Sequence, residues 1–552
     1  MRLRSVLVAV VAAVLATAGA AYLFRQELLL ALVALRVDMQ RDIAPNRPVA
    51  WQVGPAAPAA GEPPPNIVLI VADDMGMNDL SLFGDGPANG TVATPHMDAL
   101  ARDGALFLNA YAGNATCAPS RAMMMTGRYG TRFGFEFTPT PEGFGEVVSM
   151  FYNDGSKFHP MVIHEDRAAN LPPMEQQGMP TGEVTVGEVL KARGYHTVHI
   201  GKWHLGRENG SEPNAQGFDE SLLMASGLYL PEDHPDAVNA RLAFDPIDRF
   251  LWAAMRYAVS FNGGEWFEPD GYLTDYLTDQ AVAAIAANRT RPFFLYLAHW
   301  GPHTPLQALK QDYDALSHIE VHRERVYAAM LRALDRSTAR VMQALEDNAL
   351  DDNTLVIFTS DNGGAGYIGI ADVNEPYRGW KATFFEGGVR VPYFLRWPGR
   401  IEPGSRVSVP VSHLDILPTA AAAAGAIVPA DRVIDGRNIL ALASGEATSL
   451  DRRALFFRAD HYQAVIADGW KLQRSKRPEK IWLFHLDDDP TERNNVASAH
   501  PEKVAELAAL LDAHNAEQVP PLFPNAGEMP VTIDKTLADE VDASDEYIYW
   551  PG

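Results

Sequence analysis

The sequence predicts an α/β fold: a large mixed, mostly parallel sheet sandwiched by helices, with a smaller C-terminal α+β domain made of an antiparallel sheet plus a helix. Apolar runs that end in polar residues, such as NIVLIVADD at 66–74, are typical of buried parallel strands. Helical patterns alternate with these runs, which favours a sheet with helices on both faces. Beyond about residue 430 the pattern changes to short strands joined by Gly and charged turns.

The elements of the large domain follow from their local patterns. TVGEVLKARG at 185–194 predicts a helix that Gly194 closes. From Glu324 to Leu345, apolar residues recur at helical spacing and predict a long helix. Each predicted strand places polar residues at its carboxyl end, where ligands bind in such sheets. The strands predicted after the first one are 195–201, 291–299 and 354–364.

The C-terminal part has a different texture. The segments 454–473 and 480–486 predict the short strands of a meander, and 500–515 predicts a helix with Pro501 in its first turn. The tail after Gln518 is rich in Pro and acidic residues, and we expect it to be irregular. The expected divisions are therefore a main domain at 66–430, a small α+β domain at 431–518 and an irregular tail at 519–552.

The N-terminus predicts export. MRLR is basic and Ser5–Phe24 has no charge, so 1–24 is either a signal peptide or an uncleaved signal anchor long enough to span a bilayer. A second apolar patch, 28–35, follows within the expected linker at 25–65, which ends in PAAPAAGEPPP. In both cases we expect the rest of the chain to be periplasmic or extracellular, with possible anchoring to a membrane by its N-terminus.

Composition excludes some functions. The net charge of −24 argues against a nucleic-acid-binding protein, which needs a basic face, and fits a soluble acidic surface. The single cysteine among 552 residues excludes an intramolecular disulfide and a cysteine-based metal site.

Acidic residues at strand ends predict a metal site. Asp73 and Asp74 end the first strand, and Asp361 and Asn362 follow another strand in SDNGG. Adjacent buried acids repel each other and need a cation, and an all-oxygen set suits Ca²⁺ or Mg²⁺. The alternative is that Asp-Asn-Gly-Gly is only a turn.

Basic residues follow the same set of strands. Lys202 and His204 lie in GKWHLG, His303 lies in GPHTP, and Lys381 lies in GWK with Glu386 close behind it. Cations converging on one sheet edge beside a metal predict a site for a sulfate or phosphate ester. His299 is interpreted as structural.

Cys117 has two ordinary interpretations. A lone thiol can be a small buried hydrophobe, or it can be the nucleophile of a Cys–His pair. A thiolate is poorly matched to a hard, oxygen-bound cation, so the site calls for an oxygen nucleophile.

The segment CAPSRAMMMTGR, which begins at Cys117, resembles the C-x-P-S-R…T-G-R signature of the formylglycine-dependent sulfatases, the arylsulfatase family of the alkaline-phosphatase-like superfamily. The other motifs occur in that family's order, the resemblance covers about 66–516, and Met125 is a small departure. It implies that a formylglycine-generating enzyme converts Cys117 to Cα-formylglycine. It also implies that Ca²⁺, with Mg²⁺ as the alternative, is bound by Asp73, Asp74, Asp361, Asn362 and residue 117.

The resemblance also implies a role for each basic residue. A hydroxyl of the hydrated formylglycine attacks sulfur with help from the metal and Asp361, and His303 or Lys381 protonates the departing alcohol. His204 then takes a proton from the second hydroxyl, which expels sulfate and restores the aldehyde. Arg121 and Lys202 stabilise the diol and the sulfate oxygens. An ordinary serine would stop at the sulfated enzyme.

Two alternatives remain open from the sequence: a formylglycine-dependent phosphonate or phosphodiester hydrolase, and an exported anion- or glycan-binding protein without turnover. The expected substrate is a sulfated small molecule or oligosaccharide, and the acidic charge disfavours long polyanions. The segments 135–179 and 226–271 are candidate loops over the pocket. The aromatic residues considered there, which could equally be core, are Trp252, Trp266 and Tyr272.

Overall fold

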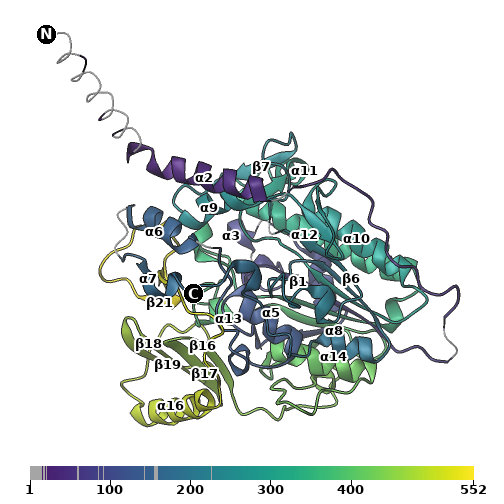
Figure 1. Cartoon of the computed structure of the whole chain (residues 1–552). Helices are drawn as coiled ribbons and strands as arrows, with labels where there is room; N and C mark the ends of the chain where they lie inside the picture. Colours follow the sequence, from purple (N-terminus) through teal and green to yellow (C-terminus); the bar gives the residue numbers. More distant parts are fainter. Residues whose placement is uncertain are drawn as a thin grey trace.

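The computed structural model describes residues 6, 15, 19, 22–40, 42–58, 61–84, 86–90, 92–141, 143–154, 159–225 and 227–552. A broad sheet crosses the larger part of the molecule with helices on both faces, and a smaller sheet with one long helix lies at its lower side (Figure 1). The fold class expected from the sequence is confirmed.

The central sheet of the described residues has ten strands. Its five inner strands, from β12 to β6, are parallel, and antiparallel pairs flank them on both sides. Their order across the sheet is β14 (Ser405–Val407), β2 (Ala105–Phe107), β13 (Tyr393–Arg396), β12 (Thr354–Ser360), β1 (Asn66–Ala72), β10 (Phe293–Ala298), β5 (His196–Gly201), β6 (Glu220–Met224), β8 (Val259–Phe261) and β9 (Trp266–Phe267).

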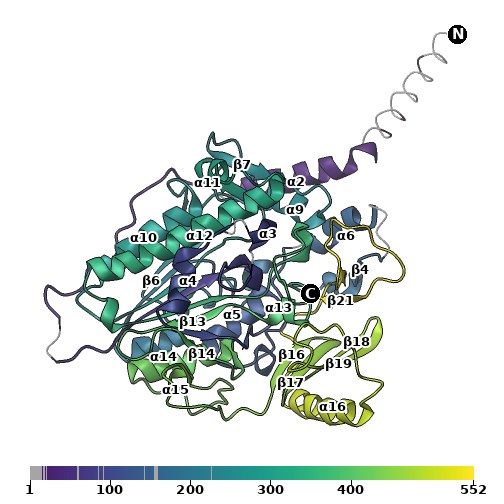
Figure 2. The same ribbon diagram turned by 180° about the vertical axis from the view of Figure 1, so that it is seen from behind.

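Helices cover both faces of this sheet because successive strand residues point to opposite sides. In β1, Val68 and Ile70 pack beneath one helix layer, whereas Ile67, Leu69 and Val71 pack beneath the other. The first layer contains α4 (Pro95–Arg102), α10 (Leu273–Ala287) and α12 (His322–Asp347), which face the reader in Figure 2. The second contains α5 (Cys117–Thr126), α8 (Val186–Ala192) and α14 (Ile416–Ala424).

The small C-terminal domain has the meander and helix that the sequence predicts. Its strands β16 (Leu455–Ala459), β17 (Tyr462–Ala467), β18 (Trp470–Lys476) and β19 (Glu479–His485) form an antiparallel sheet in that order. Leu507 and Leu511 of α16 (Pro501–Ala516) pack on this sheet.

The tail is not irregular, so that expectation is wrong. β20 (Gly527–Thr532) pairs with β21 (Tyr547–Pro551) on one side and with β4 (Val162–Ile163) on the other. Ile548 and Trp550 alternate with more exposed neighbours and are buried in a cluster with Phe384. The Pro-rich, acidic composition concealed this short alternating strand.

The expected linker at 25–65 also differs, because it begins with a helix. α2 (Arg25–Gln40) packs against α9 (Pro246–Ala254). The signal or anchor expected at 1–24 lies outside the described residues apart from 6, 15, 19 and 22–24. Within the described part of the chain, no helix combines the length and apolar character needed to cross a bilayer.

The remaining elements are short or peripheral. The helices are α3 (Pro87–Gly90), α6 (Phe144–Asp154), α7 (Glu165–Ala168), α11 (Lys310–Ala315), α13 (Glu386–Val389) and α15 (Leu440–Ala443). The strands are β3 (Ala110–Tyr111), β7 (Ala237–Ala240), β11 (Leu306–Leu309) and β15 (Val411–Ser412).

Candidate active site

Four parallel strands end side by side and bring their polar residues to one edge of the sheet. Ala72 of β1 lies opposite Ser360 of β12, and Ala298 of β10 lies opposite Gly201 of β5. Gly201 is required at its position because its φ is +107° and a Cβ there would lie 1.9 Å from the Ala298 carbonyl oxygen. The residues that follow these strands, which carry most of the predicted site, are therefore neighbours.

Three acidic residues meet at this edge. Asp73, Asp74 and Asp361 are all buried, and the Asp74 backbone N–H donates to Asp361 Oδ1 at 3.2 Å. Burial, followed by the Asp361 carboxylate, raises the pKa of Asp73 to about 7. The Asn362 amide donates to Asp74 Oδ1 at 2.8 Å. This concentration of negative charge needs cations beside it.

Each of these carboxylates has a basic partner. Lys202 Nζ lies 2.6 Å from Asp73 Oδ2, and Arg121 Nη2 lies 2.8 Å from Asp361 Oδ2. Lys381 Nζ lies 2.8 Å from Asp74 Oδ1. Burial alone would raise the pKa of Asp74. The nearby Lys381, His303 and Lys202 nevertheless hold that pKa below its usual range. The three acids and three bases balance in formal charge.

Cys117 is the first residue of α5 and lies in the middle of this cluster. Its Sγ is 3.5 Å from Asp73 Oδ1 and 3.8 Å from Asp74 Oδ1, and Lys381 Nζ is 3.2 Å away. Burial, followed by the Asp361 carboxylate, raises the pKa of the thiol far above its ordinary value. The sulfur is therefore protonated at ordinary pH, which disfavours the Cys–His alternative because the thiolate is the attacking species.

The two predicted histidines are neutral and differently placed. His303 Nδ1 donates to the Thr304 carbonyl oxygen at 2.6 Å, so Nε2 faces Asp74 Oδ2 at 3.6 Å. Burial lowers the pKa of His303 to about 3. Burial and then Lys202 and Arg121 lower the pKa of His204, whose Nδ1 is buried without a hydrogen-bond partner among the described residues. A neutral imidazole with an open nitrogen can accept a proton.

Backbone strain collects at this site. Asp74, His204 and Ala382 have φ values of 62°, 64° and 66°, in the left-handed region that residues with a Cβ rarely adopt. Such residues cost about 1–3 kcal/mol each and persist where the surrounding structure holds them in place. Asp74 and His204 belong to the predicted site, and Ala382 follows Lys381.

The oxygen atoms present fit a hard divalent cation. Ligand atoms of Asp73, Asp74, Cys117 and His303 all lie within 4.8 Å of one another. The side-chain oxygen of Asn362 is buried and has no hydrogen-bond partner within the described part of the chain. A buried amide oxygen without a donor is well suited to accept a cation. These features indicate a metal-binding site.

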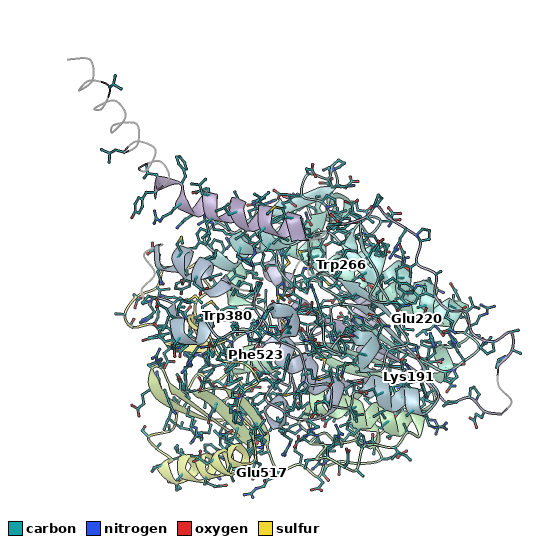
Figure 3. All side chains as sticks on the ribbon, in the orientation of Figure 1. Lys191, Glu220, Trp266, Trp380, Glu517 and Phe523 are labelled. Carbon is teal, nitrogen blue, oxygen red and sulfur yellow. The ribbon has the colours of Figure 1, made fainter. Side chains whose placement is uncertain are left out.

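A pocket beside Lys381 contains Tyr152, from the segment 135–179 that the sequence offers as a loop over the pocket, together with residues that the sequence does not single out. It combines Trp380 and Tyr367 with Tyr152 of α6 and with Tyr547 of the C-terminal tail. Trp380, labelled in Figure 3, marks its position. Lys535 also lines it, but that ammonium lies 2.8 Å from Asp545 Oδ2, which offsets its charge. The pocket is therefore mainly aromatic and apolar.

The aromatic residues proposed from the sequence lie elsewhere. Trp266 belongs to the edge strand β9 and appears apart from Trp380 in Figure 3. Tyr272 is buried and donates to the Gln307 carbonyl oxygen at 2.9 Å, and Trp252 is buried on α9. The structure favours the core interpretation for Tyr272 and Trp252, whereas Trp266 is half-buried at the edge of the sheet.

Glu386, a candidate from the sequence, and His299, which is interpreted as structural, both lie outside the acid cluster. Glu386 binds Lys471 at 2.8 Å and Arg390 at 2.9 Å in a separate buried network. His299 lies 2.9 Å from Ser337 Oγ of α12, as a structural histidine would.

The fold and the site define a class: a metal-site hydrolase of anionic esters, built at the carboxyl edge of a mostly parallel sheet. The family model described as Sulfatase matches residues 65–426, and that described as N-sulphoglucosamine sulphohydrolase, C-terminal, matches residues 379–517. The chain belongs to the sulfatase family.

Individual relatives agree with this assignment. Steryl-sulfatase of Mus musculus is 33% identical over 514 residues, covering 82% of this chain and 76% of that protein. N-acetylgalactosamine-6-sulfatase of Homo sapiens is 33% identical over 505 residues, covering 84% of this chain and 88% of that protein. The crystal structure of Ps i-CgsB in complex with k-i-k-neocarrahexaose is 30% identical, with a TM-score of 0.68, and the match covers 83% of this chain and 94% of that one. The protein is a sulfuric ester hydrolase.

Proposed function

We propose that this sulfatase works through residue 117 as Cα-formylglycine and through Ca²⁺ bound by Asp73, Asp74, Asp361, Asn362 and residue 117. The observation that carries this proposal is the position of the only thiol. Cys117 begins α5 among carboxylates and Lys381, in a setting that keeps it protonated. The site therefore has a central side chain but no reactive sulfur.

Conversion of Cys117 supplies the missing oxygen nucleophile. Replacing –CH₂SH with –CHO is an oxidation in which one oxygen atom from an external oxidant such as O₂ enters and the sulfur leaves as hydrogen sulfide. A formylglycine-generating enzyme is the partner that performs this step. When hydrated, the aldehyde supplies two hydroxyls on one carbon, so one can attack sulfur and the other can expel sulfate.

The charge balance supports a divalent cation. Three carboxylates and three cationic side chains sum to zero, so an added metal makes the site positive toward a sulfate ester. A bound cation stabilises the oxygen charge that develops during the displacement. Several protein oxygens suit Ca²⁺, which takes 6–8 ligands, better than Mg²⁺, which retains water, and Mg²⁺ is the alternative.

The other side chains of the site bind the sulfate oxygens or transfer protons. Arg121 and Lys202 hold the sulfate oxygens, while Asp361 takes up a proton from the nucleophile. Lys381, or His303 after its Nε2 has taken up a proton, gives a proton to the departing alcohol. His204 accepts the proton whose removal releases sulfate, for which its neutral ring and open Nδ1 are suited.

The departing alcohol occupies the pocket beside Lys381. Its lining of Tyr152, Tyr367, Trp380 and Tyr547 fits an aryl ring or the apolar face of a sugar. We expect a sulfated small molecule or oligosaccharide as the substrate. We also expect an exported enzyme, periplasmic or extracellular, because of the leader-like sequence at 1–24.

One assay separates this proposal from its alternatives. 4-Nitrophenyl sulfate and bis(4-nitrophenyl) phosphate are compared as substrates, with and without chelator, while bound metal is measured by plasma emission. We expect faster sulfate hydrolysis that chelation abolishes. Faster diester hydrolysis would assign a phosphodiester hydrolase, and metal-loaded, formylglycine-containing protein without turnover would indicate a binding protein.

A pair of variants tests the ligand set. Asp361→Ala should lose both bound calcium and turnover, because the remaining oxygens hold a hard cation poorly. Asp351→Ala is the matched control, since Asp351 pairs with Arg396 away from this sheet edge. Undiminished calcium in Asp361→Ala would remove Asp361 from the ligand set.

A further inference from the structure

α2 carries apolar side chains on two opposite sides, of which one is fixed on the domain. Arg256 Nη2 donates to the Ala34 carbonyl oxygen at 2.8 Å, and Arg249 Nη1 donates to Gln26 Oε1 at 3.3 Å. These contacts set the rotation of the helix about its axis. The apolar residues packed in this interface are Leu29, Leu30, Val33, Phe250 and Leu251.

The opposite side of α2 is an apolar stripe on the molecular surface. Leu28, Leu32, Leu35 and Met39 recur every three or four residues along α2, which places them on one side of the helix, and Phe24 precedes them at the same spacing. Leu32 is 62% exposed and Met39 is 73% exposed. A helix that lies on a domain in water normally carries polar residues on its outer side. Both sides of α2 are therefore apolar, but among the described residues only the inner side is covered by other parts of the protein.

We propose that this outer stripe lies on a lipid bilayer. Exposed Tyr22, Leu23 and Phe24 lead from the stripe directly into the uncharged sequence Ser5–Phe24, so α2 continues a segment of lipid-compatible composition. α2 itself is about 24 Å long, shorter than the ~30 Å hydrocarbon core, so it lies along the surface and does not span it. The apolar face of a helix that lies along a bilayer surface is buried at the boundary between the headgroups and the acyl chains.

The packing of α2 connects the membrane contact with the active site. α6 packs in the same apolar cluster as α2 and α9, and Tyr152 of α6 lines the pocket beside Lys381. α6 therefore contacts the helix on the bilayer and also forms part of the pocket for the departing alcohol. This inference does not depend on the proposed chemistry at residue 117.

The test measures the depth of a label on α2. The full chain carrying Leu32→Cys is labelled with a polarity-sensitive dye and reconstituted into vesicles of phosphatidylcholine and phosphatidylglycerol. Cys117 is 2% exposed and does not compete for the dye. We expect blue-shifted emission that brominated phosphatidylcholine quenches. The matched control is Glu506→Cys on α16, at the opposite end of the molecule (Figure 1), which should keep water-like, unquenched emission.

A variant with charged residues in the stripe tests membrane contact in protein whose folding is checked by its activity. Leu28→Glu with Leu35→Glu should abolish quenching at position 32 while hydrolysis of a soluble aryl sulfate is retained. Water-like emission at position 32 in vesicle-bound protein would overturn the proposal. A blue shift without quenching, in protein whose mass by light scattering is that of a dimer, would also overturn it, because a second copy would then cover the stripe.

Discussion

Cys117 shows how a residue's surroundings can remove its ordinary chemistry. Its thiol lies between two carboxylates and one ammonium group, and burial raises its pKa. Under the proposed mechanism, an active site organised around a protonated sulfur has no nucleophile until that sulfur is replaced. On that proposal, the chemical state of this one side chain decides whether the enzyme is active.

The first prediction concerns the mass of this residue. Active enzyme should contain a peptide about 18 Da lighter than its cysteine form, because –CHO replaces –CH₂SH at position 117. Mass spectrometry of the tryptic peptide measures the converted fraction, which should rise in proportion to specific activity across preparations. Full activity in protein that carries only the thiol would contradict the proposal.

The second prediction separates His303 from His204. If His303 assists departure of the alcohol, His303→Ala should lose most activity with poor leaving groups and little with activated aryl sulfates, which need no proton. If His204 assists release of sulfate, His204→Ala should release about one equivalent of phenol and then stop, as a covalent intermediate accumulates. Stopped-flow release of 4-nitrophenol and mass analysis of the trapped protein provide the measurement.

The division of labour fails if both variants respond alike to the leaving group and His204→Ala gives no burst. Their positions make different responses the expected result. His303 has its Nδ1 engaged by Thr304, whereas the Nδ1 of His204 has no hydrogen-bond partner among the described residues.

At the scale of elements, α9 links α2 to the catalytic domain and contains a buried carboxyl group. Asp248 accepts hydrogen bonds from Leu242 N–H at 2.8 Å and Trp252 Nε1 at 3.1 Å, both at Oδ2. Burial raises the pKa of Asp248 from 3.8 to about 7. The folded protein therefore binds this proton more tightly than the unfolded chain does.

The third prediction follows from the sign of that difference. The stabilising contribution of protonated Asp248 is complete below about pH 3.8 and is lost as pH rises through about 7. Asp248→Asn keeps a neutral group of the same shape. Between pH 5 and 8 the wild type should therefore lose about 3 kcal/mol of stability relative to this variant, measured by urea denaturation. Parallel pH profiles would show that the carboxyl group does not carry the proton.

At the scale of the whole molecule, the pocket joins segments from distant parts of the chain. Tyr152 comes from α6, Trp380 from the loop that carries Lys381, and Tyr547 from the C-terminal strand β21. The next residue, Ile548, is fully buried in the cluster that includes Trp550 and Phe384. Packing of the tail thus positions one wall of the pocket.

The fourth prediction tests this role of the tail. Ile548→Ala should cost about 2–5 kcal/mol of stability, as buried Ile→Ala changes do, and should also raise KM for aryl sulfates. Leu511→Ala on α16 is the matched control, because Leu511 is equally buried but packs in a separate cluster. It should lower stability by a similar amount with KM unchanged. An equal effect on KM would show that the tail acts only through general stability.

The difference between local sequence patterns and long-range packing explains which parts of the structure the sequence could predict. Strands β1, β10 and β12 contain continuous apolar runs, whereas His196, Thr197 and His199 interrupt the apolar residues of β5. The polar ends of these four strands meet because parallel strands align. This pattern alone is enough to bring Asp73, Lys202, His303 and Asp361 together. Lys381 is expected at the same edge as one of the converging cations. Cys117 lies outside the pattern, and its motif places it in the site by resemblance.

The missed features depend on long-range packing. The strand at 547–551 is five residues long and lies in an acidic, Pro-rich tail, so its alternation is a weak signal. Which aromatic residues reach the pocket depends on how α6 and the tail pack, and local patterns carry no record of that. Trp252 and Tyr272 are as aromatic as Tyr152 and Tyr547, yet only the latter two line the pocket.

The burial of Cys117 also sets an order of events in time. The thiol is 2% exposed, at the start of a helix whose ten residues are all buried beneath the sheet and the loops at its edge. If Cys117 is converted as proposed, a modifying enzyme could not close its own active site around a side chain in that position. The segment 117–128 would be accessible to that enzyme only before the chain folds, during or just after synthesis. Folding would then bury whichever chemical form residue 117 has reached, so the active fraction of a preparation would be fixed before each molecule folds.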